Sequence, residues 1–180
     1  MKFDIAVIGA GSAGLSVAAA AAQFGQTVVL FEKDTMGGDC LNTGCVPSKA
    51  LLAAASAAEG HRSSDAFGIA GHEPGVDFTA VMAHVQRVIA AIAPHDSVER
   101  FESLGVTVVR AAAKFIAPQT LEAGGEIYEA RRIVVATGSR PAVPPVPGLE
   151  AVPFFTNETI FRNTTLPSPL IIIGGGPFCL

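Results

Sequence analysis

A glycine-rich turn between a short apolar run and an alanine-rich segment constrains the fold of this chain more than any other feature. Residues 3–8 are rich in β-branched side chains and predict a buried strand that ends at Gly9. Residues 12–24 predict a helix that Gly25 ends, and residues 27–31 predict a second buried strand. A strand, a helix and a strand within about thirty residues form the minimal parallel crossover unit. We therefore expect an α/β fold with a doubly wound, mainly parallel sheet.

The glycines of this turn, Gly9, Gly11 and Gly14, have the spacing G-x-G-x-x-G. The first allows the tight turn, the second lets a pyrophosphate approach the backbone, and the third lets helix and strand pack closely. The helix N-terminus adds free N–H groups for the phosphates. Glu32 ends the second strand, where a carboxylate accepts hydrogen bonds from ribose hydroxyls and repels a 2′-phosphate. The turn predicts a dinucleotide site that disfavours NADP. Spacing alone does not separate FAD from NAD, and a ligand-free packing loop is the alternative.

The rest of the chain predicts further helices and strands. An alanine-rich helix is expected over residues 47–59, with Gly60 just past its end, and Asp77 is expected to cap a helix that Pro94 breaks. A shorter helix follows, up to Leu104. Further strands are expected at residues 106–109, 114–116 and 133–136, with a hairpin turning at Gly124-Gly125.

A proline-rich stretch divides the chain into two parts. Four prolines within residues 139–148 predict a stiff connector. Residues 170–173 then predict one more buried strand, which leads into a second glycine turn at residues 174–176, with its third fingerprint glycine expected at about Cys179. We expect one complete dinucleotide-binding domain over residues 1–150. Residues 151–180 are expected to form a connector and the first strand of an incomplete second one.

Two cysteines, Cys40 and Cys45, lie five residues apart in the sequence GGDCLNTGCVPSK. This spacing is a little more than one helical turn, so modest distortion would bring the sulfur atoms to bonding distance. A thiolate near a helix start has a lowered pKa, and Lys49 adds positive charge nearby. The pair predicts a redox dithiol. A zinc site and two inert cysteines are the alternatives, and for zinc the third cysteine is remote and no histidine is close.

Composition and charge exclude several classes of partner. The net charge is −4, the longest basic run is Arg131-Arg132, Trp is absent and there is one Tyr. We therefore expect no nucleic-acid partner and no acidic membrane surface. The uncharged stretch at residues 5–31 is interrupted by glycines and preceded by Asp4, which argues against a membrane span or a signal peptide. We expect a cytoplasmic location, where a close cysteine pair is more often catalytic or metal-binding than structural.

Residues 37–49, together with the glycine turn and Glu32, resemble the class I pyridine nucleotide-disulfide oxidoreductases. Residues 133–141 resemble the second flavin motif of this family, and residues 171–177 resemble the start of its NAD(P)H domain, so the resemblance covers essentially the whole chain. Pro-Ser-Lys after Cys45 is closer to the mercuric reductase and dihydrolipoamide dehydrogenase branches than to glutathione reductase. The resemblance implies a Rossmann-like FAD-binding domain with a small antiparallel β element, a full-length enzyme that also uses NAD(P)H, and a homodimer.

The resemblance also implies roles for individual residues. Cys40 would be the interchange thiol and Cys45 the thiol beside the flavin, with electrons passing from NAD(P)H to FAD, to the disulfide, and then to a disulfide or metal-ion substrate. The residues implied at the FAD site are Gly9, Gly11, Ser12, Ala13, Gly14, Glu32, Lys33, Gly38, Asp39, Lys49, Ala111, Ala113, Thr137, Gly138 and Ser139.

The sequence departs from the family pattern at several points. Asp39 stands where the family usually has Thr, and we expect its carboxylate to raise a thiol pKa or weaken a flavin contact. Ala111 replaces a usual Gly. No counterpart of the family's catalytic His–Glu pair is present, and the histidines are expected on the surface or in loops: His61, His72, His84 and His95. We expect a truncated chain, through a natural end or a frameshift, that is inactive alone. The alternatives are an FAD-binding fragment without turnover and a dithiol protein without flavin.

Overall fold

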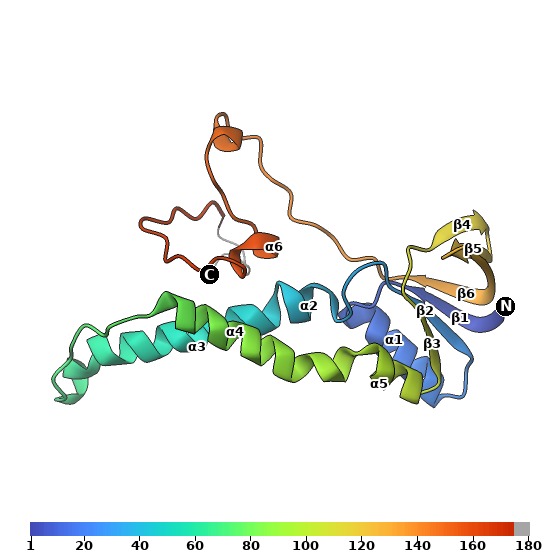
Figure 1. Ribbon diagram of the computed structural model, residues 1–180, viewed down its shortest axis with the longest axis horizontal. Coiled ribbons are helices and arrows are strands. Elements are labelled where there is room, and N and C mark those ends of the chain that lie inside the picture. The colour runs from blue at the N-terminus through green and yellow to red at the C-terminus, as the bar shows by residue number, and fades with distance from the viewer. Residues whose placement is uncertain (175–180) are drawn as a thin grey trace.

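A six-stranded sheet lies at one end of the molecule, at the right of Figure 1, in the computed structural model, which describes residues 1–174. The strand order is β3-β2-β1-β6-β5-β4. Four of the strands run parallel: β1 (Lys2–Ile8), β2 (Val28–Phe31), β3 (Val106–Val109) and β6 (Glu126–Val135). The other two, β4 (Lys114–Ala117) and β5 (Thr120–Ala123), continue the sheet in antiparallel fashion. The predicted Rossmann-like fold with a small antiparallel element is confirmed.

The helices occupy two regions. Beside the sheet lie α1 (Ser12–Gln23) and α5 (Val98–Ser103). A long arm extends away from the sheet and consists of α3 (Cys45–Arg62) and α4 (Phe78–Ile92), with the short α2 (Gly38–Asn42) at its base (Figure 1). The remaining helical turns are η1 (Ser64–Phe67), η2 (Ala93–Asp96), η3 (Leu149–Ala151) and α6 (Asn157–Ile160). No helix within residues 1–174 is long and apolar enough to cross a membrane.

The two faces of the sheet are covered by different elements because successive side chains of a strand point to opposite faces. Val7 of β1 packs with Leu15 of α1 and Phe101 of α5. The neighbouring Ala6 packs instead with Tyr128, whose ring lies edge-on to Phe31 with centroids 5.0 Å apart. The sheet is therefore covered by helices on one face and by side chains of the antiparallel strands on the other.

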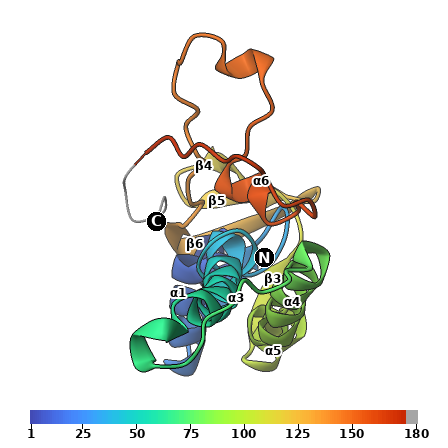
Figure 2. The ribbon, with the colours of Figure 1, turned by 90° about the vertical axis from the view of Figure 1, so that its left-hand side faces the viewer.

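A separate small core closes the arm. Ala50 of α3 packs against Met82 and Val85 of α4, and Phe161, just after α6, completes the cluster. The Gln86 side chain donates a hydrogen bond of 3.0 Å to the Phe161 carbonyl, which fixes the returning chain on the arm. Figure 1 shows α6 next to the arm and well away from β6, where the chain leaves the sheet, and Figure 2 shows the same helix from the end of the arm.

Three predicted elements differ from the structure. The helix expected at residues 47–59 begins earlier and ends later, at Cys45 and Arg62, because Gly60 keeps a helical backbone. Residues 133–136 do not form a strand of their own, since one strand runs from Glu126 to Val135. Residues 170–173 form no strand. They are 55–84% exposed, and they pair with none of the six strands of the sheet. The second glycine fingerprint, up to Cys179, lies mostly outside the described residues, and the domain division at residue 150 stays a prediction.

Candidate functional site

The ends of the parallel strands bring the predicted site residues to one edge of the sheet. The backbone N–H of Gly9 donates to the Phe31 carbonyl at 2.8 Å, and that of Glu32 donates to the Val109 carbonyl at 3.0 Å. On the other side, the N–H of Ala136 donates to the Ile8 carbonyl at 2.8 Å. The glycine turn, Glu32 and the segments after β3 and β6 are therefore neighbours, although together they span more than a hundred residues of the sequence.

Two glycines of the turn, Gly9 and Gly14, have space for hydrogen atoms only. Gly9 has a φ of +104°, and a Cβ atom there would lie 2.3 Å from the Ala136 carbonyl oxygen. A Cβ atom on Gly14 would lie 1.8 Å from the carbonyl oxygen of Gly9. The first glycine thus allows the turn beside β6, and the third lets α1 pack against the turn, as the fingerprint predicts.

The start of α2 also contacts the glycine turn. A Cβ atom on Gly38 would lie 2.5 Å from the Cα of Gly11, so the two backbones are in direct contact. The N–H of Gly37 donates a hydrogen bond of 2.9 Å to the Ala10 carbonyl. These contacts hold the cysteine-bearing segment against the turn.

The first turn of α1 presents N–H groups that no side chain caps. Its N-cap is Gly11, which has no side chain to accept a bond, and both Ser12 and Ala13 are exposed. A helix N-terminus with exposed N–H groups attracts anions through these groups and through its positive partial charge. The geometry therefore fits a phosphate group at this position.

Glu32 is buried, with 9% of its surface exposed, and both carboxylate oxygens accept a backbone hydrogen bond. Oε2 accepts from the N–H of Ala10 at 2.7 Å, and Oε1 accepts from the N–H of Asp34 at 2.8 Å. Because each carboxylate oxygen has two acceptor sites, each can accept one further bond from a ligand hydroxyl. Glu32 thus both fixes the turn and keeps acceptor capacity.

The two cysteines lie on two successive helices, α2 and α3. Cys40 is in the middle of α2 and is partly buried, whereas Cys45 is the first residue of α3 and is exposed. Both thiols are free. Gly44 allows the tight connection between the helices, since a Cβ atom there would lie 2.9 Å from the carbonyl oxygen of Asp39. The tight connection therefore keeps the two thiols close enough to interact.

The expected lowering of the thiol pKa is wrong for Cys40. The hydrogen bond between its side chain and that of Cys45 raises the pKa of Cys40, and partial burial raises it further. A hydrogen bond in which the thiol is the donor is lost on ionisation, and a second thiolate nearby would repel the first. The neighbouring thiol therefore outweighs any gain from the short helix α2.

The carboxylate that acts on the Cys40 thiol comes from η2. Asp96 adds a smaller contribution that raises the pKa of Cys40. Asp39, for which the sequence predicted this role, is exposed and accepts a long hydrogen bond of 3.5 Å from the Thr43 hydroxyl. No local pattern indicates Asp96, because it comes near the dithiol only through the packing of α4, which precedes η2, against α2.

The other predicted site residues lie at the rim of this edge or near it. Ala111 and Ala113 are partly buried and pack against the Tyr128 cluster, while the remaining five are exposed: Lys33, Lys49, Thr137, Gly138 and Ser139. As expected, the histidines lie on the surface or in loops, with only His84 partly buried.

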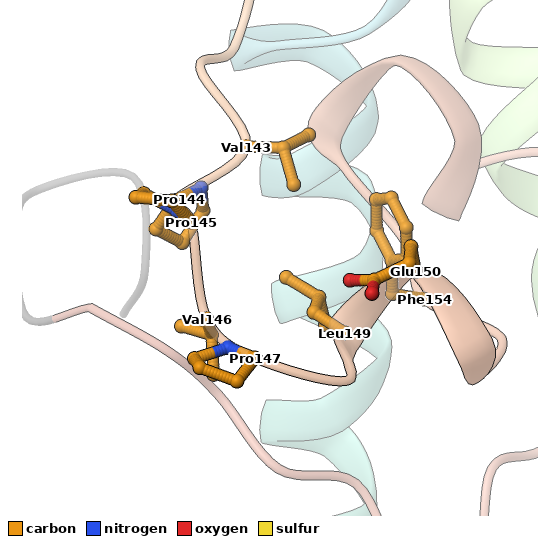
Figure 3. A pocket seen from close by; sticks show the side chains of 8 residues that line it. All are labelled: Val143, Pro144, Pro145, Val146, Pro147, Leu149, Glu150 and Phe154. Carbon is orange, nitrogen blue, oxygen red and sulfur yellow. The ribbon is translucent and has the colours of Figure 1, made fainter.

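Two pockets lie outside the strand edge. The one nearer the dithiol has a volume of about 180 Å³ and is lined by Thr35, Asn42, Thr43, Gln86, Ile89, Glu158, Phe161 and Arg162. The other has about 310 Å³ and lies within the proline-rich connector, where apolar side chains such as Val143, Leu149 and Phe154 point toward one another (Figure 3). Glu150 is the one charged side chain among its eight lining residues, so this pocket offers little for catalysis.

Comparison with known proteins gives the family. Residues 3–180 match the family described as pyridine nucleotide-disulphide oxidoreductase. The chain belongs to this family. The mercuric reductase of Streptomyces lividans is 37% identical over 180 residues, which cover 97% of this chain and 38% of that protein. The mercuric reductase of Shigella flexneri is 35% identical, with 98% of this chain and 32% of that protein covered. The chain therefore spans about a third of the length of these relatives.

The fold also agrees with a solved structure. The flavoprotein disulfide reductase RclA from Escherichia coli, solved as a Cu(II) complex, superposes with a TM-score of 0.72 at 24% identity, over 91% of this chain and 34% of that one. The predicted family is confirmed, and with it an oxidoreductase family whose cofactor is FAD and whose partner is NAD(P)H.

Proposed function

We propose that this chain forms the FAD-binding, dithiol-bearing part of an enzyme that passes electrons from NAD(P)H to FAD, to the Cys40–Cys45 disulfide, and then to a substrate. The observation that supports this most directly is the contact between Gly11 and Gly38. It joins the dinucleotide turn to α2, which carries Cys40. A redox thiol and a predicted cofactor site thereby occupy adjacent segments.

The residues at the strand edge fit FAD. The uncapped N–H groups after Gly11 suit a pyrophosphate, the lack of a side chain at Gly11 lets it approach the backbone, and Glu32 has free acceptor sites for ribose hydroxyls. When bound, FAD supplies hydride acceptance from NAD(P)H and delivery of an electron pair to the disulfide. In this proposal Cys45, which is exposed, lies beside the flavin, and Cys40 meets the substrate.

The dithiol stores the electron pair between the two half-reactions. Reduction of the Cys40–Cys45 disulfide consumes two electrons and two protons and breaks one S–S bond, which gives the two thiols of the structure. Because the neighbouring Cys45 raises the pKa of Cys40, the Cys40 thiol keeps its proton to a higher pH than an isolated thiol would.

We propose Hg²⁺ as the substrate. The relatives with 37% and 35% identity are mercuric reductases, and two adjacent thiols suit a soft metal ion. Binding of one Hg²⁺ would form two S–Hg bonds and release the thiol protons. A low-molecular-weight disulfide is the alternative substrate, and it would oxidise the same pair by exchange.

Thiol titration distinguishes the two substrates. In the Cys179→Ser variant, Cys40 and Cys45 are the thiols that the titration counts. One equivalent of Hg²⁺ should make both unreactive without oxidising them. A competing small dithiol that removes the Hg²⁺ should therefore restore both. The variant in which Cys40 and Cys45 are both Ser should bind no Hg²⁺ tightly. The opposite outcome is that both thiols still react with the thiol reagent after Hg²⁺ is added, and are rapidly oxidised by lipoamide. In that case the metal-ion assignment is wrong and the disulfide assignment is correct.

We further propose that the 180 residues bind FAD without accepting hydride from NAD(P)H. In support, the part of the chain that the structure describes has a single strand–glycine turn–helix unit, which follows β1. The purified chain should retain FAD and its yellow colour on gel filtration. Addition of NADH or NADPH should leave the colour unchanged, whereas dithionite should bleach it. Rapid bleaching by either nucleotide would refute this part of the proposal.

A further inference from the structure

Two histidines meet at the far end of the arm. His61 lies in the last turn of α3, and His72 lies in the loop that returns toward α4 at the left of Figure 1. Their ring centroids are 4.9 Å apart, with an angle of 65° between the ring planes. Both side chains are exposed, so water and dissolved ions reach the ring nitrogens.

The backbone holds the two rings together. The N–H of His72 donates a hydrogen bond of 3.0 Å to the carbonyl of His61. Gly71, one residue earlier, passes so close to the helix end that a Cβ atom there would lie 2.6 Å from the Arg62 carbonyl oxygen. Its N–H donates to the Asp65 carboxylate at 2.8 Å. The pairing of the rings is therefore a property of the folded loop.

The charges around the pair favour a cation. Arg62, next to His61, forms hydrogen bonds of 2.6, 2.9 and 3.0 Å with Glu73 and lies 3.8 Å from Glu59. Asp65 adds a third carboxylate at the same loop. Three carboxylates against one guanidinium leave the surroundings of the rings negative.

We propose that His61 and His72 form a site for one divalent transition-metal ion, completed by water. Metal–nitrogen bonds of about 2.0–2.1 Å require the two ligating nitrogens to lie within about 4 Å of each other. Rings with centroids 4.9 Å apart reach this by side-chain rotation alone. Imidazole nitrogen is a preferred ligand of Ni²⁺, Cu²⁺ and Zn²⁺. Such an ion would clamp the return loop to the end of α3.

This site is independent of the dithiol. Cys45 is the first residue of α3 and His61 is the last but one, so the helix separates them by about 24 Å at 1.5 Å per residue. A metal ion held by the histidines cannot contact either thiol.

Ni²⁺ binding to the full chain tests the proposal. The measurement uses the variant with Cys40, Cys45 and Cys179 all replaced by Ser, because thiols also bind Ni²⁺. Isothermal titration should give one Ni²⁺ per chain, and His61→Ala and His72→Ala should each weaken the binding at least tenfold. The double variant should bind at least as weakly as the weaker single variant, because it keeps neither ligand.

His95→Ala is the matched control, since His95 is an exposed histidine on η2 far from the loop. It should keep the full affinity, and the far-UV circular dichroism of all variants without metal should agree. Equal affinity in the parent, His61→Ala and His72→Ala chains would show that the rings merely pack together. Equal losses in all three single variants would show nonspecific binding, and either result overturns the proposal.

Discussion

The Oε2 atom of Glu32 accepts a hydrogen bond of 2.7 Å from the backbone N–H of Ala10, and this bond joins the end of β2 to the middle of the glycine turn. The other oxygen accepts from Asp34, at the start of the next loop. A single buried carboxylate therefore fixes two loops of the candidate cofactor site before any ligand binds. Its predicted role toward ribose is added to a structural role that the sequence did not indicate.

Glu32→Ala should destabilise the protein by about 2–3 kcal/mol, because it leaves two backbone N–H groups of the site without their charged acceptor. Urea unfolding of the chain without FAD measures the loss. Glu32→Gln keeps the side-chain shape and one acceptor oxygen, so it should cost less. Equal unfolding midpoints for Glu32→Ala and the parent would contradict the structural role.

Gly14→Ala should disrupt the turn, since the added Cβ would lie 1.8 Å from the Gly9 carbonyl oxygen. We expect a loss of more than about 2 kcal/mol in the free energy of unfolding and at least a tenfold weaker retention of FAD. Gly60→Ala is the control, because this glycine lies within α3 with no atom within 4 Å of the added Cβ. That change should stabilise the chain by about 0.5–1 kcal/mol and leave FAD binding unchanged.

Cys45→Ala should lower the pKa of Cys40, because it removes the hydrogen bond that contributes most to raising it. The rate of iodoacetamide alkylation at Cys40, followed by peptide mapping across a pH series, should then reach its midpoint at a lower pH than in the parent. Asp96→Asn should shift the midpoint in the same direction by a smaller amount. An unchanged midpoint in Cys45→Ala would mean that the two thiols do not interact.

Asp4 and Thr27 should give a pH-dependent contribution to stability at the start of the sheet. The Asp4 carboxylate accepts bonds from the Thr27 hydroxyl at 2.7 Å and from its N–H at 3.0 Å, and these bonds lower the pKa of Asp4. A lowered pKa in the folded state stabilises the protein above the usual aspartate value of about 3.9, and this contribution is lost as the pH falls through the lowered value.

Thr27→Val removes the hydroxyl and keeps the shape of the side chain. The pKa of Asp4, measured by an NMR titration, should rise toward the usual value, and the loss of stability below about pH 4 should become less steep. The effect should be small and should weaken in high salt, because Asp4 is at the surface. A titration curve of Asp4 that is identical in both proteins would refute the assignment.

The sequence predicted the parts of the fold that depend on neighbouring residues. The run from the first strand to Glu32 follows from the spacing of Gly9, Gly11 and Gly14 between two apolar strands, and the Asp77 cap is confirmed by its bond from the N–H of Ala80 at 3.0 Å. The predicted elements that the structure contradicts depend on contacts with residues far away in the sequence. Residues 170–173 have the composition of a strand, but a strand also needs a neighbour to accept its backbone hydrogen bonds, and the composition does not supply one.

The candidate site shows the same division. The glycine positions and the cysteine pair could be predicted from the sequence, because each depends only on residues a few positions away. The raised pKa of Cys40 is not, since it depends on how Cys45 is placed after Gly44 and on Asp96, which comes from another helix. The carboxylate next to Cys40 in the sequence, Asp39, points to solvent instead.

The place of Phe161 in the arm has a consequence for the order in which the protein is made. The sheet needs no residue after Val135, so it can form on the ribosome as soon as β6 emerges. The core between α3 and α4 is completed only when Phe161 joins it, and the carbonyl of Thr43 accepts its hydrogen bond from Asn157 equally late. In the nascent chain the dinucleotide edge and its contacts with the dithiol segment can therefore form before the arm receives its last packing residue.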